Sequence, residues 1–173
     1  MRRKFALAAL LVLVTVTALA LVIAPTASAK AETMTFTGTE VFVASTPLSY
    51  TVTGGVAHLA FANIFYDTAS ANQAMLEGYT LTHLYAVATL VGGVPTDSVI
   101  RGTVHKDTAA GEWAGTLNGT MSMTDLTWDC KIRGRGISGD VTGMLMFGRN
   151  VKTAPGPFGV AILTGTVLAP HGF

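Results

Sequence analysis

Residues 111–148 constrain the fold most, because this glycine-rich stretch has the pattern of three consecutive strands. It also contains both tryptophans and the single cysteine of the chain. Within it, residues 126–135 alternate between apolar and polar side chains, which is typical of a strand with one buried and one solvated face. Its glycines predict the bends and close backbone approach that a small closed barrel needs at its corners. The stretch therefore predicts an antiparallel β-meander that curls.

Strand patterns fill most of the remaining chain. A loop with one short turn is expected over 66–78 and a second loop over 149–157, and Gly54-Gly55 and Asn118-Gly119 predict hairpin turns. This spacing predicts an all-β domain, a single antiparallel β-barrel of about eight strands, with a β-sandwich as the alternative. The expected strands are 35–44, 48–53, 56–65, 79–91, 99–106, 112–118, 126–135, 141–147 and 158–168.

Short glycine and tryptophan motifs resemble a known group of secreted barrels. Gly111-Glu112-Trp113-Ala114-Gly115, Gly134-Arg135-Gly136, Gly139 and Gly143 follow the spacing G-x-W-x-G … G-x-G-x-x-G-x-x-x-G of proteins similar to allene oxide cyclase and the dirigent proteins. The resemblance implies a barrel of about eight strands. Plant members of the group isomerise an oxylipin epoxide or steer radical coupling, and trimers occur among them. No catalytic residue of those enzymes matches a position here, so the resemblance implies a fold and the option of a homo-oligomer rather than an activity.

The first 29 residues have the organisation of a secretory signal peptide. Arg2, Arg3 and Lys4 precede an apolar run over 5–24, and Ala27-Ser28-Ala29 has the small-x-small pattern that signal peptidase cleaves. We therefore expect a signal peptide over 1–29 and one β-barrel domain over 30–173, in a secreted or extracytoplasmic protein. The alternative is an uncleaved membrane anchor at 5–24, because this run is about as long as a membrane span.

Charge and cysteine content narrow the expected partners. Without the three basic residues of the signal, eight basic residues face ten acidic ones, a net charge of −2, so no nucleic-acid partner is expected. The lone Cys130 has no partner for an intramolecular disulfide and is expected to be a buried thiol, with an intermolecular disulfide or a reactive thiol as the alternative. A basic stripe is expected on the solvated face of a strand, with an anionic partner as the alternative. It comprises Lys131, Arg133 and Arg135, joined by Arg149 and Lys152.

Motifs for common chemistries are incomplete. Residues 134–139 satisfy G-x-G-x-x-G, but a strand pattern follows where a dinucleotide site needs a helix N-terminus. Ser138 lacks the final glycine of a nucleophile elbow, because Asp140 stands there. The four histidines, His58, His83, His105 and His171, are scattered without a nearby carboxylate at a recognised ligand spacing. We therefore expect no cofactor, no metal site and no assignable catalytic residue.

Aromatic side chains are the candidates for lining a cavity. The favoured expectation for the lumen is a core filled with side chains; if the barrel instead holds a ligand, Tyr85, Trp113, Trp128 and Phe147 are expected to contact it. We expect a non-catalytic binding module for a small apolar molecule or a partner, with an isomerase or cyclase resembling allene oxide cyclase, or a structural envelope protein, as alternatives. The state of the lumen distinguishes these functions: buried His58, His83 or Glu77 facing Trp128 would favour an enzyme, an open apolar cavity without ionisable groups a binding module, and a closed core a structural role.

Overall fold

The computed structural model describes residues 30–173 except 47, 71, 157–158 and 171. The predicted signal peptide and the alternative anchor at 5–24 lie outside these residues. The strands are β1 (Glu32–Ser45), β2 (Leu48–Thr53), β3 (Val56–Ser70), β4 (Gly78–Val91), β5 (Val94–Thr108), β6 (Gly111–Ser122), β7 (Thr127–Gly136), β8 (Leu145–Lys152) and β9 (Val160–Ala169). Two short 3₁₀ helices, η1 (Ala74–Leu76) and η2 (Gly139–Val141), complete the elements. No helix in the described part of the chain is long and apolar enough to cross a membrane.

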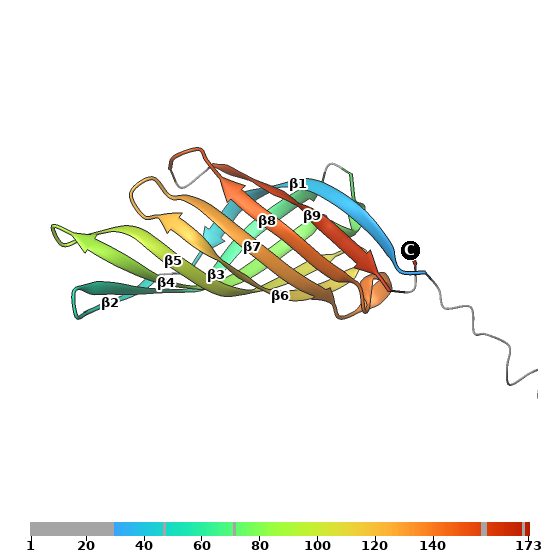
Figure 1. The fold of residues 1–173 in the computed structure, drawn as a ribbon, viewed down its shortest axis with the longest axis horizontal. Helices are drawn as coiled ribbons and strands as arrows, with labels where there is room; N and C mark the ends of the chain where they lie inside the picture. Colours follow the sequence, from blue (N-terminus) through green and yellow to red (C-terminus); the bar gives the residue numbers. More distant parts are fainter. Residues whose placement is uncertain (1–29, 47, 71, 157–158, 171) are drawn as a thin grey trace, which may run out of the picture. The chain divides into compact units, whose positions relative to one another are not determined.

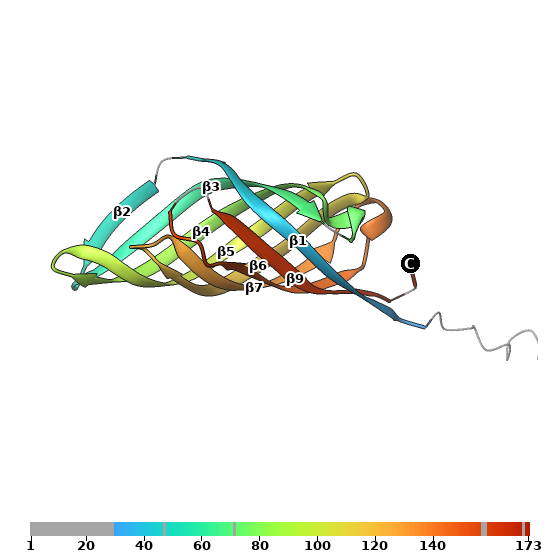
Figure 2. The same cartoon turned by 90° about the horizontal axis from the view of Figure 1, so that it is seen from above.

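The strands form one antiparallel sheet that closes on itself (Figures 1 and 2). Their order is β1-β9-β8-β7-β6-β5-β4-β3-β2, and β1 also pairs with β3. Eight strands therefore close a barrel, and β2 is an additional strand paired with β3. This closure confirms the predicted antiparallel barrel and excludes the alternative of a β-sandwich, because full closure leaves no second sheet.

Side chains alternate between the lumen and the outer surface along the strands of the closed barrel. In β4, Thr80, Thr82 and Leu84 are buried, while Tyr79 and Tyr85 on the other parity are exposed. In β7 the predicted buried parity is confirmed, since Cys130 and Ile132 are buried while Lys131 and Arg133 on the other parity are exposed. The barrel interior is therefore the hydrophobic core, as the two-residue period of a strand requires.

Inward-facing glycines let neighbouring strands approach closely. A Cβ built on Gly119 would lie 2.0 Å from the carbonyl oxygen of Asp129, and one on Gly115 would lie 2.2 Å from that of Arg133. The predicted hairpin turn at Asn118-Gly119 is therefore wrong, because β6 continues through both residues and pairs with β7. The glycine is required by strand contact and not by turn geometry.

The loop boundaries also differ from those expected. Strand β3 runs to Ser70, so only the second half of the expected loop over 66–78 is irregular, and η1 supplies its short turn. Strand β8 begins at Leu145, because Gly139–Val141 forms η2, and it runs to Lys152. The apolar runs predicted where these strands lie, but the turns on either side change the residues at which the strands begin and end.

The two ends of the barrel are built differently (Figure 1). Both 3₁₀ helices lie at the end where β1 begins and β9 ends, and there Leu76, Trp113 and Val141 are almost fully buried. At the opposite end, the β2–β3 and β4–β5 hairpins extend beyond the β6–β7 and β8–β9 hairpins in both views. One end is thus plugged by side chains, and the other carries a projecting lip.

Candidate functional site

The barrel interior contains a partly open cavity of about 230 Å³. Its wall is mainly apolar, with Ile64, Leu84 and Val104 among the lining residues. It extends to Ser45 and Leu126, which lie towards the lip end of the barrel. For comparison, a dry apolar cavity of about 150 Å³ holds one benzene molecule. The cavity therefore has room for a small organic molecule.

Aromatic rings form one side of this cavity. The ring of Tyr66 makes edge-to-face contacts with Phe42 and Trp128, with both centroid distances 6.2 Å. All three residues line the cavity. Edge-to-face packing fixes the orientation of aromatic rings beyond what burial alone does. This side of the cavity is therefore a rigid apolar surface.

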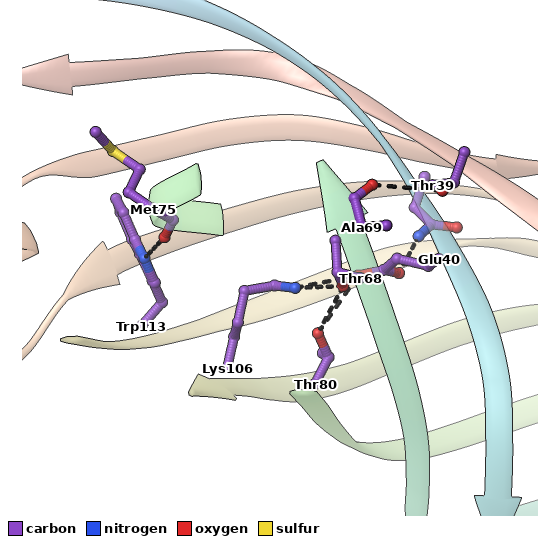
Figure 3. Close-up of polar contacts among 9 residues, drawn as sticks. Thr39, Glu40, Thr68, Ala69, Met75, Thr80, Lys106 and Trp113 are labelled. Atoms are coloured by element: carbon purple, nitrogen blue, oxygen red, sulfur yellow. Dashed lines mark hydrogen bonds and ion pairs between the residues drawn. The ribbon is translucent and has the colours of Figure 1, made fainter. Parts of the chain in front are cut away.

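A buried polar cluster interrupts the apolar wall (Figure 3). We call it the Glu40 cluster. Five strands each contribute one member, and every member is at least nine-tenths buried. Glu40, Thr80, Lys106 and Asn150 also line the cavity, while Thr68 lies between Glu40 and Lys106 (Figure 3). Its members are Glu40 of β1, Thr68 of β3, Thr80 of β4, Lys106 of β5 and Asn150 of β8.

Hydrogen bonds converge on the Glu40 carboxylate. Thr68 Oγ1 donates to Glu40 Oε1 at 2.9 Å, and Thr80 Oγ1 lies 3.2 Å from Thr68 Oγ1 and 3.5 Å from Glu40 Oε1. On its other oxygen, Glu40 accepts from Asn150 Nδ2. Lys106 Nζ donates to Thr68 Oγ1 and lies 3.7 Å from Glu40 Oε1. These bonds supply the solvation that a carboxylate loses when it is buried.

The cluster is connected to the aromatic side of the cavity. Trp128 Nε1 donates to Asn150 Oδ1 at 2.5 Å, and Asn150 in turn donates to Glu40. Lys106 has a lowered pKa because burial disfavours its charged form, while the Glu40 carboxylate opposes this shift. A buried ion pair therefore faces an otherwise apolar cavity, next to an indole ring.

The side-chain amine of Lys152 binds the loop after β8 beside Trp128. Its Nζ lies 5.2 Å from the centroid of the Trp128 ring and donates to the carbonyl oxygens of Leu126 at 2.8 Å, of Ala154 at 2.6 Å and of Gly156. Burial lowers the pKa of Lys152. The prediction that Lys152 joins an outer basic stripe is wrong, because its parity in β8 points inward and the side chain is buried.

The rest of the expected stripe lies on the outer surface. Lys131, Arg133 and Arg135 are exposed, as predicted for the solvated face of β7. Arg149 is also exposed, and its Nε donates to Asp129 Oδ1 at 2.6 Å while Nη2 donates to Oδ2. This pairing neutralises one charge of the stripe.

The four aromatic residues expected around a ligand lie in three different places. Trp128 lines the cavity. Trp113 is buried at the plugged end of the barrel, where its Nε1 donates to the carbonyl oxygen of Met75 at 3.2 Å (Figure 3). Tyr85 and Phe147 are each 45% exposed on the outer surface, since their parities in β4 and β8 point away from the lumen. Of the four, the structure brings Trp128 alone to the cavity.

The ionisable residues in the lumen differ from those expected. His83 and Glu77 are exposed, and His58 points outward, where its Nδ1 lies 2.6 Å from the hydroxyl of Tyr85. Glu40 and Lys106 occupy the lumen instead. The sequence did contain a signal for them. Glu40 shares its parity with Phe36 and Phe42, and Lys106 shares its parity with Val104, so both lie on apolar strand faces.

Cys130 lines the cavity as a buried thiol, as predicted. Burial raises its pKa to about 12, with smaller contributions from Asp129 and Glu40. A thiol with so high a pKa is protonated at neutral pH and is a weak nucleophile. Cys130 therefore contributes volume and polarisability to the cavity wall rather than covalent chemistry.

One histidine does meet carboxylates on the outer surface, contrary to the expectation from spacing. His105 Nε2 lies 3.0 Å from Asp107 Oδ1 and 3.9 Å from Glu112 Oε2. The three side chains come together because Asp107 and Glu112 are partners across the β5–β6 ladder. All three side chains are well exposed, and the contacts of His105 with the two carboxylates account for the arrangement, so we assign no metal site to them.

Comparisons with protein-family models, curated proteins and solved structures find no match for this chain. The resemblance to the allene oxide cyclase and dirigent group thus rests on motif spacing alone. The function has to be argued from the cavity.

Proposed function

We propose that this protein is a secreted or extracytoplasmic, non-catalytic binding module whose barrel holds a small apolar ligand. The observation that carries the proposal is the partly open, mainly apolar cavity of about 230 Å³. Ligand sites in proteins are typically concave and apolar, with a few convergent polar groups. The Glu40 cluster supplies such groups at one place on the wall.

The cavity favours binding over a purely structural role. A barrel of this size either fills its lumen with side chains or leaves room for one small molecule. Here side chains fill the lumen at the plugged end, where Trp113 is almost fully buried, while the lumen towards the lip end is left unfilled. An unfilled apolar volume lowers stability, so a ligand that occupies it would stabilise the fold.

Mass spectrometry under native conditions tests the proposal. The full chain, 1–173, is expressed in a bacterial host and purified from the extracytoplasmic fraction, and its mass is measured before and after organic extraction. We expect loss of residues 1–29 and a stoichiometric apolar adduct that extraction removes. If the protein has its polypeptide mass and still carries no adduct after incubation with lipid extracts, the result favours a structural role over binding.

Two matched variants connect the adduct to the lumen. Val104→Phe adds a ring to the cavity wall, whereas Thr103→Phe adds the same ring to the outer surface of the same strand. We expect the first variant to lose the adduct and the second to keep it. Equal adduct on both would place the ligand outside the barrel.

The buried ion pair supports one second candidate, an isomerase or cyclase. Ionisable groups inside an apolar lumen can position a reactive substrate and stabilise developing charge. Glu40 and Lys106 lie in the lumen beside Trp128, although the residues differ from those expected there. Chemical analysis of ligand extracted at successive times separates the two functions. A rearranged ligand of unchanged mass that stops accumulating in Glu40→Gln would support catalysis, and an unchanged ligand supports binding.

A further inference from the structure

The Glu40 cluster specifies the chemistry of the ligand that the cavity takes. We propose that this ligand is a neutral apolar molecule carrying one hydrogen-bond-accepting oxygen, such as a ketone, an ether or an alcohol, and that Lys106 Nζ donates to this oxygen. This inference rests on the proposed binding function. It goes further by naming the polar group of the ligand and the residue that recognises it.

The spare hydrogen-bonding capacity of the cluster lies on Lys106. A protonated lysine carries three N–H donors. Lys106 Nζ donates to Thr68 Oγ1 and lies 3.7 Å from Glu40 Oε1, which leaves one donor without a partner among the described residues. Lys106 lines the cavity and is 2% exposed, so solvent cannot easily satisfy this donor. An acceptor oxygen on a bound ligand would do so.

The charge of the cluster selects against ionic ligands. Glu40 and Lys106 form a pair with no net charge, and burial makes any further unpaired charge costly. A ligand carboxylate would lie near the Glu40 carboxylate, and a ligand ammonium would lie near Lys106. Both like-charge contacts would be made in surroundings of low dielectric constant. A neutral oxygen avoids both contacts and still accepts a hydrogen bond.

Tyr66 supplies a second donor on the same wall. It lines the cavity, and no hydrogen bond of its hydroxyl to another described residue is present. Burial raises the pKa of Tyr66, and Glu40 and Cys130 raise it further, so the hydroxyl keeps its proton and can donate. The apolar part of the ligand would then lie against the aromatic side formed with Phe42 and Trp128.

Calorimetric titration of the secreted full-chain product with a matched series of compounds tests the inference. The probes are n-octane, 2-octanone, 1-octanol, octanoate and octylamine at pH 7. We expect 2-octanone and 1-octanol to bind at least about tenfold more tightly than octane, octanoate or octylamine, because a hydrogen bond from a charged donor is among the stronger ones. Affinities within twofold across the series, or tightest binding of either ion, would overturn the inference.

Variants assign this preference to Lys106. In Lys106→Met the ratio of 2-octanone to octane affinity should fall markedly, to the preference that the Tyr66 hydroxyl alone supplies, whereas Lys131→Met, which removes a lysine from the outer surface, should leave it unchanged. The double variant Glu40→Gln/Lys106→Met removes both charges of the Glu40–Lys106 pair and makes the same test if the single variant does not fold. A preference that is undiminished in the folded Lys106 variant would overturn the assignment.

The outcomes separate the inference from the function on which it rests. If octane binds as tightly as the ketone, the cavity is a binding site and only the polar specificity is refuted. If no member of the series binds, and the native protein also carries no adduct, both the proposed function and the inference fail.

Discussion

The inner and outer faces of the barrel wall each carry an ion pair, and the two pairs have opposite surroundings. Glu40 and Lys106 lie 3.7 Å apart inside the lumen, with side-chain exposures of 6% and 2%. Asp129 and Arg149 make two direct hydrogen bonds on the outside, with exposures of 41% and 60%. The outer pair has the better geometry, but water already solvates both of its members. The inner pair is shielded from water, so removing one of its members should matter far more.

Removing one inner charge should have the largest effect on stability. Lys106→Met leaves the Glu40 carboxylate buried without its cation, which typically costs about 3–5 kcal/mol. Urea unfolding at pH 7 measures the free energy of unfolding, with Lys131→Met as the control of equal side-chain change. A loss as small as that of the control would show that the inner pair is solvated much like the outer one.

Removing both inner charges should recover most of that loss. In Glu40→Gln/Lys106→Met neither member of the inner pair is charged, and the amide oxygen of the new side chain can still accept from Thr68. We expect the double variant to regain at least about half of the 3–5 kcal/mol lost by Lys106→Met. Additive losses in the same urea experiment would mean that the two residues stabilise the barrel independently.

Breaking the link to Trp128 should have an intermediate effect. Asn150→Leu removes the donor to Glu40 Oε2 and the acceptor for Trp128 Nε1, and leaving such buried groups unpaired costs about 1–3 kcal/mol. Urea unfolding followed by tryptophan fluorescence measures the loss. Since the indole also loses its fixed orientation, the emission of the folded state should shift. An unchanged spectrum with unchanged stability would contradict this link.

The same contrast between faces explains how far the sequence could predict the structure. The alternation in residues 126–135 identified the two faces of β7, and the glycine spacing predicted a curled sheet. The cavity residues were harder to predict, because each of five strands contributes a single polar residue to a cluster that exists only after closure. The hairpin turn predicted at Asn118-Gly119 was wrong for a related reason. A glycine that accommodates a neighbouring strand has the same sequence pattern as a glycine in a turn.

Cys130 and its neighbour Asp129 extend the comparison to pH. The Cys130 thiol has a pKa raised to about 12 by burial, from a usual value of 9.0. A raised pKa stabilises the folded state fully below the unfolded pKa, and this contribution is lost as pH rises towards 12. At pH 10 wild type should have lost about 1.4 kcal/mol relative to neutral pH through this group. Comparing urea unfolding of wild type and Cys130→Ala at pH 7 and pH 10 isolates the effect, and parallel declines would contradict it.

Asp129, on the outer face, should show the smallest effect and the opposite direction. Its hydrogen bonds with Arg149 lower the pKa of Asp129, so its contribution is present above the unfolded pKa of 3.8 and is lost as pH falls through the lower folded value. Because both side chains are exposed, solvent screening weakens the pair. Arg149→Met should therefore be only slightly less stable than wild type at pH 7 and in low salt, and the difference should vanish in 1 M salt and shrink as pH falls through the lowered pKa of Asp129. A difference as large as that of Lys106→Met, persisting in high salt, would mean that the outer face stabilises the barrel as strongly as the lumen does.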